Sequence, residues 1–288
     1  KELRERTGLG MMECKVALTE TKGDMEAAAD LLRKRAGAKV EKKAGRIAAE
    51  GAISVHASPD RKTAAMIEVN CETDFVAKGD EFVAFAAAVA ARVTRSQPAD
   101  VDALYQLPVQ DDAPTSIAQA REGLVMKLGE NINVRRFEQL TTDQGHIGSY
   151  VHSGNKIGVL VVLEGGDENL AKDVAMHVAA SRPEYVSKDQ VPAAAVAKEK
   201  EIFAEQARAS GKPADIIEKM VMGRVNKYLG EITLLGQPFV KDPETSVEKL
   251  LKSKGATVKG FIRYEVGEGL EKRSDNFAAE VMATVKGA

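Results

Sequence analysis

Apolar residues near the start of the chain recur at helical spacing. Asp24 can cap a helix because its carboxylate can accept the free N–H groups of a first turn. Four apolar positions then share one face of that helix: Met25, Ala28, Ala29 and Leu32. A shorter stripe precedes them: Met11, Cys14 and Leu18, followed by a break at Lys22-Gly23-Asp24. With residues 1–6, this pattern predicts a three-helix module of about 40 residues, which is small enough to be only marginally stable alone.

The apolar period then changes to that of β-strands. Residues 53–57 alternate between apolar and polar side chains, and residues 67–71 do so again after a turn at Pro59-Asp60, which predicts a β-hairpin. Residues 72–79 are expected to form a loop. A helix is predicted from Asp80 on the apolar stripe Phe82, Phe85, Ala86, Val89 and Val93.

A weakly patterned, turn-rich segment covers residues 96–114. The next helix is expected to be capped by Thr115 or Ser116 and to end at Gly129. Its apolar positions are Ile117, Ala120, Leu124, Val125 and Leu128. Residues 131–140 are predicted to form a third strand.

The same order of elements recurs in the second half of the chain. Strands are predicted over residues 147–152 and 157–164, and Asp167 opens a helix that Pro183 ends. A later helix over residues 247–254 leads to a strand over residues 257–266. The chain therefore contains two copies of one α+β unit, residues 51–140 and 145–267, with an insertion in the second copy.

That insertion, residues 192–232, contains two helical runs joined by Ser210-Gly211-Lys212-Pro213. Two helices with so short a connection predict an antiparallel hairpin that projects from the body. Its apolar stripe has to be buried against something. Packing back on its own core and self-association of two chains both remain open.

Net charge argues against a protein that coats nucleic acid. The 288 residues include 41 basic and 43 acidic side chains, for a formal charge of −2. Affinity for phosphates comes from an excess of Lys and Arg. One local exception is the stretch over residues 33–46, where seven basic residues face a single Glu41, a local charge of +6. An RNA-binding role for this stretch remains an alternative.

The sequence contains few features of catalytic or cofactor-binding motifs. There is no GxxxxGK[ST] loop, no HExxH pair and no GxSxG elbow, and Gly8-Leu9-Gly10 lacks the third glycine of a dinucleotide motif. The four histidines show no zinc spacing: His56, His146, His152 and His177. Cys14 and Cys71 lack CxxC spacing and suit a reducing compartment. We expect no enzyme activity, no cofactor and no metal.

Thr73-Asp74-Phe75-Val76 is the most distinctive local motif. It follows a buried strand and precedes a helix, where a loop projects from a rigid base. An acid beside a large aromatic ring makes a wedge with a charged edge. The alternative is purely structural, with Asp74 as a turn or capping residue and Phe75 as a staple onto the following helix.

Several segments resemble the elongation factor Ts family, in the order of that family and over essentially the whole chain. The first are Lys1-Glu2-Leu3-Arg4-Glu5-Arg6-Thr7-Gly8, Gly10-Met11-Met12, Cys14-Lys15 and Glu68-Val69-Asn70-Cys71-Glu72-Thr73-Asp74-Phe75-Val76-Ala77. The others are Gly129-Glu130-Asn131-Ile132, Met176-His177-Val178-Ala179-Ala180, Gln237-Pro238-Phe239-Val240 and Val266-Gly267-Glu268-Gly269. Together these motifs are highly specific.

The resemblance implies a domain plan that the segmentation reached independently. It predicts an α+β protein with two related antiparallel-sheet and helix subdomains. The expected parts are a ubiquitin-associated-like helical module with a basic linker (residues 1–46), a core N-subdomain (47–140), a core C-subdomain (141–267) and a C-terminal helical module (268–288). A helical hairpin at about residues 190–232 is inserted in the third part, and a C-terminal helix is expected over residues 277–285. In the family such a hairpin serves dimerisation.

The resemblance also implies a guanine-nucleotide exchange factor for the GTPase elongation factor Tu. Thr73, Asp74, Phe75 and Val76 match the stretch that enters the GTPase and disturbs its magnesium site, so that GDP leaves. Further partner-facing residues carried over by position are Met11, Met12, Lys15, Lys43, Leu128 and His152. Such a factor is expected in the cytoplasm, without a membrane segment or a catalytic group of its own. An RNA-binding accessory of translation is the alternative.

Overall fold

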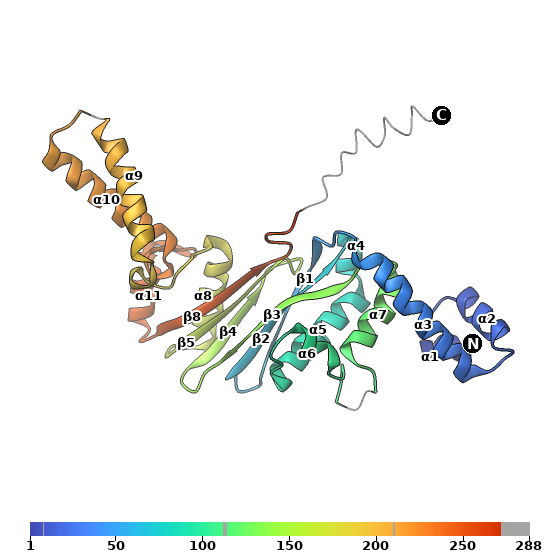
Figure 1. Ribbon diagram of the computed structural model, residues 1–288. Helices are drawn as coiled ribbons and strands as arrows, with labels where there is room; N and C mark the ends of the chain where they lie inside the picture. Colours follow the sequence, from blue (N-terminus) through green and yellow to red (C-terminus); the bar gives the residue numbers. More distant parts are fainter. Residues whose placement is uncertain (8, 112–113, 210, 272–288) are drawn as a thin grey trace. The chain divides into compact units, whose positions relative to one another are not determined.

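The computed structural model describes residues 1–7, 9–111, 114–209 and 211–271 (Figure 1). The chain divides into two compact units. The first contains residues 1–54 and 67–137 with the described residues from 265 onward, and the second contains residues 55–66 and 138–264. Helices and small sheets are mixed in the fold, which confirms the predicted α+β class. The division into four parts stays a prediction, and the C-terminal helix expected over residues 277–285 lies outside the described residues.

Three helices form the N-terminal part of the first unit, as predicted: α1 (Glu2–Thr7), α2 (Met11–Glu20) and α3 (Met25–Ala44). Asp24 caps α3 by accepting the Ala27 N–H at 3.0 Å. The side chains that pack together are Leu3, Leu9, Cys14, Ala17, Ala28, Ala29 and Leu32. The basic stretch that was assigned to a linker is helical as far as Ala44, because α3 continues well past this cluster.

The first sheet has the strand order β1-β2-β3. Its strands are β1 (Glu50–Ala57), β2 (Thr63–Cys71) and β3 (Asn133–Thr141). Helices α5 (Asp80–Ser96), α6 (Val101–Gln106) and α7 (Ile117–Leu128) cover one face (Figure 1). Ser116, not Thr115, caps α7. Helix α6 lies in the segment expected to be turns, because Asp100 supplies a cap through the Ala103 N–H at 2.7 Å and Leu104 is buried.

The prediction of a loop over residues 72–79 is wrong at its centre. A short helix, α4 (Asp74–Lys78), follows β2 directly. Thr73 is its cap and Gly79, with extended backbone, ends it before α5 begins. Five residues are too few to show helical periodicity in a sequence, which is why the pattern did not reveal this element.

The second unit contains a sheet of order β4-β5-β8. Its strands are β4 (His146–Val151), β5 (Ile157–Glu164) and β8 (Thr257–Glu265), and its helices are α8 (Glu168–Ser181) and α11 (Val247–Ser253). Strands β4 and β5 are antiparallel, with Ile147 opposite Val162. Buried side chains of β5 and α8, among them Val161 and Val174, form a core that also includes Leu251 of α11.

The two sheets share their connectivity and an unusual pair of glycines. In each, a hairpin is followed by helices and then by a strand that pairs with the second strand of the hairpin. Gly51 has φ +147°, and a Cβ there would lie 2.1 Å from the Val69 carbonyl oxygen. Gly145 has φ +80°, and a Cβ there would lie 2.1 Å from the Leu163 carbonyl oxygen. Both sheets therefore require glycine where the first strand passes close to the backbone of the second.

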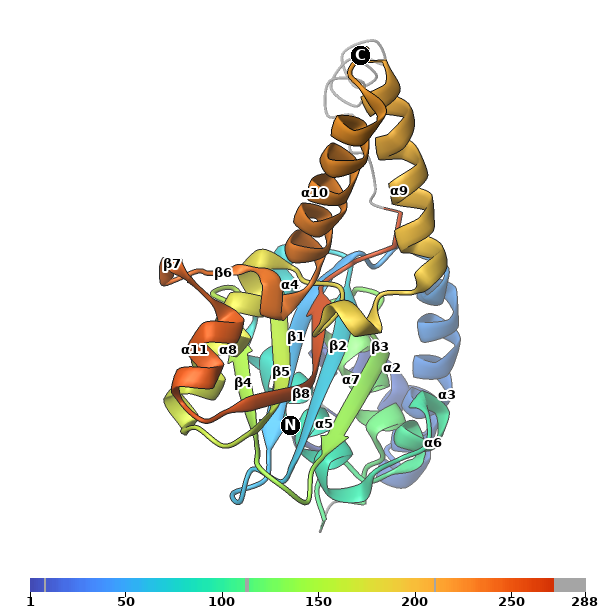
Figure 2. The same ribbon diagram turned by 90° about the vertical axis from the view of Figure 1, so that its left-hand side faces the viewer.

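The inserted hairpin consists of α9 (Ala193–Arg208) and α10 (Ala214–Ile232), which lie side by side and extend away from the sheet of their unit (Figure 2). Pro192 and Pro213 precede the two helices, where a missing N–H costs little. The stripe packs between the helices through Ala207, Val221 and Val225, with Phe203 beside them. Its main contact is thus within the hairpin and not with the rest of the core, and self-association of two chains stays a prediction.

Two further segments follow α8 and α10. They contain four short elements that were not predicted from the sequence: the helices η1 (Lys188–Gln190) and η2 (Leu234–Gly236) and the antiparallel strands β6 (Pro238–Phe239) and β7 (Asp242–Ser246). Buried His177 of α8 holds this region in place. Its Nε2 lies 2.9 Å from Gln237 Oε1, and its Nδ1 accepts the Val240 N–H at 3.1 Å. Two segments of the family resemblance, around His177 and Gln237, therefore meet in the fold.

Candidate functional site

Helix α4 presents an aromatic ring to solvent. The Phe75 side chain is 84% exposed, whereas Ala77, on the other side of the short helix, is buried. Fully burying a phenylalanine stabilises a protein by about 1.5–3 kcal/mol. Because the Phe75 ring remains in water, the folded chain does not gain this stabilisation. The staple alternative for Phe75 is therefore wrong, because the ring does not pack on the helix that follows.

Thr73 shapes the start of α4. Its Oγ1 accepts the Val76 N–H at 3.4 Å, which is the hydrogen bond of a helix N-cap. The Cys71 thiol donates to the Thr73 carbonyl oxygen at 3.1 Å. The capping alternative for Asp74 is wrong by one position, because Thr73 has the extended backbone that a cap requires and Asp74 is already helical.

A carboxylate from another part of the chain binds the same residues. Glu130, just beyond α7, accepts the backbone N–H groups of Glu72 and Thr73 at its Oε2, each at 3.0 Å. Its Oε1 accepts the Thr73 hydroxyl at 2.6 Å. Three donors from two consecutive residues thus converge on one side chain, which fixes both the position and the direction of the chain entering α4.

Glu72 completes the arrangement in the opposite direction. Its Oε1 accepts the Asn131 N–H at 2.7 Å, and the Arg46 guanidinium lies 3.4 Å from the same oxygen. The Asn131 side chain is buried and donates to the carbonyl oxygens of Ala44 and Arg46, at 3.3 and 2.8 Å. The end of α3, the start of α4 and the residues after α7 are therefore joined at one place within the first unit.

Asp74 is half-buried and lies next to Phe75 in the first turn of α4. Its Oδ2 accepts from Lys78 Nζ at 2.6 Å, an i,i+4 ion pair along the helix. A carboxylate in a first helical turn is also favoured by the helix dipole. The predicted wedge, an acid beside an aromatic ring, is thus present on one short helix, with the ring outermost.

Among the other predicted site residues, three lie together on α2. Met11 and Met12 are 68% and 64% exposed, and Lys15 is exposed. Met11 and Lys15 border a hollow of about 590 Å³ whose apolar floor includes Leu3 and Leu18. Exposed methionines beside a lysine form a surface that suits an adaptable protein contact.

The remaining predicted residues are spread over both units. Lys43, in the last turn of α3, donates its ammonium to the Gly129 carbonyl oxygen, and Leu128 ends α7 half-buried just before it. Both therefore adjoin the residues that hold α4. His152 belongs to the second unit, where it is exposed just beyond the end of β4, and its Nδ1 lies 3.0 Å from the Tyr150 hydroxyl.

Intramolecular partners bind much of the basic stretch over residues 33–46. Arg35 pairs with Glu20 at 2.6 Å and Lys39 with Glu13 at 2.5 Å, while Arg46 faces Glu72. Arg33 lies 3.9 Å from Asp30. A stretch with a formal charge of +6 in the sequence is thus largely compensated within the fold, which weakens its attraction for RNA.

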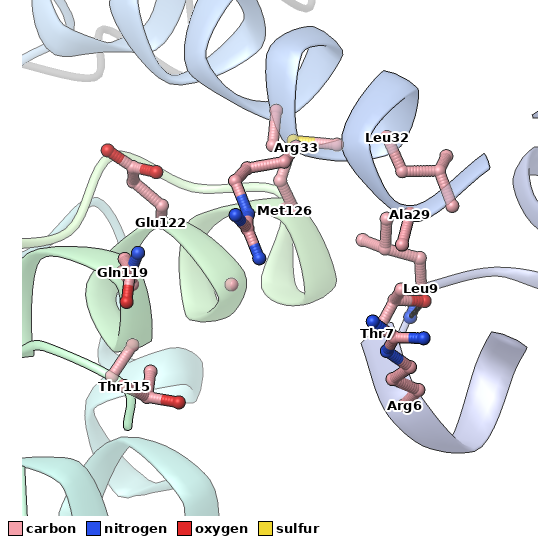
Figure 3. Close-up of a pocket in the computed structure, with 13 residues that line it drawn as sticks. Arg6, Thr7, Leu9, Ala29, Leu32, Arg33, Thr115, Gln119, Glu122 and Met126 are labelled. Carbon is pink, nitrogen blue, oxygen red and sulfur yellow. Dashed lines mark hydrogen bonds between the residues drawn. The ribbon is translucent and has the colours of Figure 1, made fainter. Parts of the chain in front are cut away.

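A second hollow, of about 320 Å³, lies between the N-terminal helices and α7 (Figure 3). In Figure 3 the Arg33 side chain extends from α3 towards α7, and Arg6 lies on the other side. Met126 of α7 packs against the N-terminal core, so that the helices touch beside the hollow. Within the described residues, no group of three or more His, Cys, Asp or Glu is placed to hold a metal ion. In that same part of the chain, no helix is long and apolar enough to cross a membrane.

Glu72, Glu130 and Asn131 were not among the predicted site residues. All three stand within segments of the family resemblance, but their contacts join residues far apart in the chain. No local pattern signals such a contact. The only hint was that Gly129-Glu130-Asn131-Ile132 is distinctive without being apolar, periodic or catalytic.

Comparisons with known proteins identify the family. The family model described as "Elongation factor TS" matches residues 72–268. Elongation factor Ts of Methylococcus capsulatus is 60% identical over 99% of this chain and 97% of its own length. The protein of the same name from Thioalkalivibrio sulfidiphilus is 60% identical over 100% of this chain and 97% of its own, and that of Alkalilimnicola ehrlichii is 56% identical over 100% and 97%. This chain therefore belongs to the elongation factor Ts family of translation elongation factors.

Proposed function

We propose that this protein is a guanine-nucleotide exchange factor that binds the GDP form of elongation factor Tu and promotes GDP release. The observation that carries the proposal is the 84% exposed ring of Phe75 on a helix held by Glu130. Large rigid aromatic side chains are frequent among the residues that dominate protein interfaces. A ring that is exposed and yet fixed at its base is suited to enter a pocket of a second protein.

Asp74 and Phe75 would act together in this mechanism. Magnesium bridges the phosphates of a bound nucleotide and is held by the GTPase's own side chains and helices. Insertion of Asp74 and Phe75, flanked by Thr73 and Val76, would shift those supports and weaken the electrostatic clamp on GDP. Because the factor binds the nucleotide-free form best, linkage requires that GDP and the factor weaken each other's binding. No catalytic group, cofactor or metal of its own is needed, so we propose that the protein is not an enzyme.

Other surfaces would provide affinity. Met11, Met12 and Lys15 form one exposed face on α2 and are proposed to contact the nucleotide-binding domain of the partner. Lys43 and Leu128 would contribute beside the wedge, although the Lys43 ammonium already binds the Gly129 carbonyl. His152 is proposed as a contact from the second unit.

The helical hairpin is proposed to mediate pairing of two copies of this chain. Its inner stripe is filled by its own two helices, but Ile202, Ile216 and Met222 remain 38–47% exposed on the outside. Apolar residues exposed on the outside of the two helices provide surface for contact with a second copy. We also propose that the protein acts in the cytoplasm and that α1–α3 form a ubiquitin-associated-like module. The two core subdomains are proposed to be related to each other, which the shared strand order of their sheets supports.

The alternative of an RNA-binding accessory has less support. Its only motivation is the basic stretch over residues 33–46, and four of those side chains already have acidic partners. Neutralising Lys42, Lys43 and Arg46 should then have little effect on RNA retention. Salt-dependent RNA binding that disappears in such a variant would favour the alternative.

The exchange proposal is tested by stopped-flow release of fluorescent GDP from elongation factor Tu. Phe75→Ala should slow the release stimulated by this protein by more than about tenfold, which corresponds to roughly 1.4 kcal/mol of lost stabilisation. Val240→Ala removes an exposed apolar side chain that belongs to none of the proposed contacts and is the control, for which release should stay unchanged. Unaltered release with folded Phe75→Ala protein would overturn the proposed role of the wedge.

A further inference from the structure

Helix α4 cannot set its own conformation. It has only five residues, Asp74–Lys78, whereas isolated helices shorter than about 12–15 residues are marginal in water. The Asp74–Lys78 pair adds little, because exposed i,i+4 pairs contribute only about 0.3–0.5 kcal/mol. On the buried side, only Ala77 anchors it. The direction in which Phe75 points therefore has to be imposed from outside the helix.

Glu130 is the group that imposes it. Both oxygens of this carboxylate are used, Oε2 by the N–H groups of Glu72 and Thr73 and Oε1 by the Thr73 hydroxyl. That hydroxyl in turn accepts the Val76 N–H inside α4. A continuous chain of hydrogen bonds thus runs from Glu130 through Thr73 into the helix that carries Phe75.

Only a carboxylate can satisfy all three donors. An ionised carboxylate is purely an acceptor with about four lone-pair sites, whereas an amide has one acceptor oxygen and an NH₂ group that donates. Glutamine could still accept the two N–H groups and donate to the Thr73 hydroxyl, but the charge assistance would be lost. Alanine would leave all three donors to water. The chemistry predicts graded consequences, with Gln between Glu and Ala.

Glu72 performs the reciprocal task for the segment that carries Glu130. Its Oε1 accepts the Asn131 N–H at 2.7 Å, so that each carboxylate binds the backbone beside the other. Asn131 also reaches the end of α3 through its side chain. The pair is therefore a closed clamp between two segments of the first unit.

We infer that Glu130, with Glu72 as its reciprocal partner, is a positioning residue that pre-forms residues 73–76 for entry into the GTPase; this inference rests on the proposed exchange function. Without the clamp, residues 73–76 populate many conformations and only a fraction is competent to enter. The apparent affinity then falls by that fraction, whereas the rate within the assembled complex is preserved. Removal of the Phe75 ring should instead lower the rate of GDP release within the complex, because the complex assembles but lacks the inserted aromatic side chain.

The test is stimulated release of fluorescent GDP measured over a range of factor concentrations, with the full-length chain. Glu130→Ala should raise the concentration for half-maximal stimulation by roughly tenfold and leave the saturating rate within about twofold, as loss of a pre-organised state predicts. Glu130→Gln should show a smaller increase. Phe75→Ala should instead lower the saturating rate. Glu122→Ala removes a carboxylate of α7 that does not bind Glu72 or Thr73, and this variant should behave as the unaltered protein.

A second readout separates positioning from general damage. Amide hydrogen exchange of residues 72–77 should accelerate in Glu130→Ala and Glu130→Gln, while exchange in β2 and α5 stays as in the unaltered protein. If Glu130→Ala fails to fold, Glu130→Gln provides the measurement, because it keeps the shape and part of the hydrogen bonding.

The outcomes distinguish the inference from the function on which it rests. Glu130 variants that match Glu122→Ala in both readouts, alongside an impaired Phe75→Ala, would overturn the positioning role and leave the exchange function standing. A Phe75→Ala protein with unaltered exchange would overturn the function itself. A fall in saturating rate, without a shift in half-maximal concentration, would show that Glu130 acts by direct contact and would also refute positioning.

Discussion

Thr73 and Asp167 cap helices at corresponding junctions of the two sheets. Thr73 Oγ1 accepts the Val76 N–H at 3.4 Å, and Asp167 Oδ1 accepts the Leu170 N–H at 2.8 Å. Thr73 follows Val69 by the same number of residues as Asp167 follows Leu163, and Val69 and Leu163 are the residues approached by the two close-packed glycines. The cap is thus a shared feature of both sheet-to-helix connections.

The two junctions differ in the helix that begins at the cap. After Asp167, α8 runs unbroken for 14 residues against β4 and β5. After Thr73, α4 stops after five residues at Gly79, and α5 begins anew. The connection in the first sheet therefore uses its first helical residues to present Phe75, whereas that in the second sheet uses them for its core. The candidate site is a local departure from a connection that is otherwise similar in the two sheets.

The close-approach glycines give the first stability prediction. Gly51→Ala and Gly145→Ala should each lower the free energy of unfolding by about 2–4 kcal/mol, because the new Cβ would collide with a backbone carbonyl and the positive φ is strained. Gly23→Ala is the matched control, since it has φ +89° but no atom within 4 Å of the added Cβ. It should cost only about 1 kcal/mol. Urea unfolding followed by circular dichroism measures all three, and equal losses would refute the collision argument.

Glu68 gives a prediction for acid stability. It is fully buried and accepts from Arg135, Arg136 and the Gly267 N–H, at 3.1, 2.7 and 2.8 Å. Burial acts to raise the pKa of Glu68, but the hydrogen bonds from Gly267, Asn70 and Arg136 outweigh it, so the pKa lies below its ordinary value. The folded state therefore binds this proton less readily than the unfolded state does. Its contribution to stability is complete above about pH 4.5 and is lost as the pH falls through the lowered pKa.

Replacement of Glu68 tests this directly. Glu68→Ala should cost about 3–5 kcal/mol at pH 7, because two arginines lose a buried partner. Glu68→Gln should cost less and should show a shallower loss of stability between pH 5 and pH 3 than the unaltered protein, since the glutamine does not titrate. Denaturant unfolding over this pH range provides the measurement. An identical slope in the two proteins would exclude Glu68 as a contributor.

His177 predicts a second pH dependence with the same sign. Burial lowers the pKa of His177, and the hydrogen bond to Gln237 only partly opposes this. The folded protein therefore holds this imidazole neutral, with Nδ1 accepting from Val240, while the unfolded chain binds a proton near pH 6.5. Stability from this group is complete above about pH 6.5 and is lost as the pH falls towards the lowered pKa.

A variant series isolates the contribution of His177. His177→Gln should be less stable at pH 7.5 but should lose less further stability between pH 6.5 and 5 than the unaltered protein. Urea midpoints at several pH values measure the effect. A His177→Gln protein that keeps the full slope would assign the pH dependence to other groups.

The hairpin predicts a separation between folding and self-association. Val221→Ala should destabilise the pairing of α9 and α10 by about 1–3 kcal/mol, because the side chain lies in their shared core. Met222→Lys, at the exposed neighbouring position, should leave helix content unchanged but abolish dimers in sedimentation equilibrium. Dimers that persist in Met222→Lys would place the contact elsewhere.

Local sequence determined most of the secondary structure. The caps at Asp24 and Asp167, the alternation in β1, the nearly continuous apolar run of β5 and the stripes of α5 and α7 all predicted elements that the structure contains. Each of these signals comes from residues that are close together in the sequence. A capping residue or an apolar face of this kind can therefore be recognised from the sequence alone. The candidate wedge was also located from the sequence, although its functional interpretation was based on the family resemblance and not on the local pattern.

Tertiary structure decided what those elements do. The outward direction of Phe75, the convergence of Glu72 and Thr73 on Glu130, and the bond from His177 to Gln237 each depend on residues that are distant in the chain. A carboxylate that stabilises a turn has no periodicity of its own, because the orphaned donors it satisfies belong to another segment. A five-residue helix likewise lacks the cooperative length to form by itself and exists only where the fold supplies its caps. The sequence by itself thus determined most of the longer elements, whereas packing decided that the five-residue α4 forms and that it leaves an aromatic ring exposed.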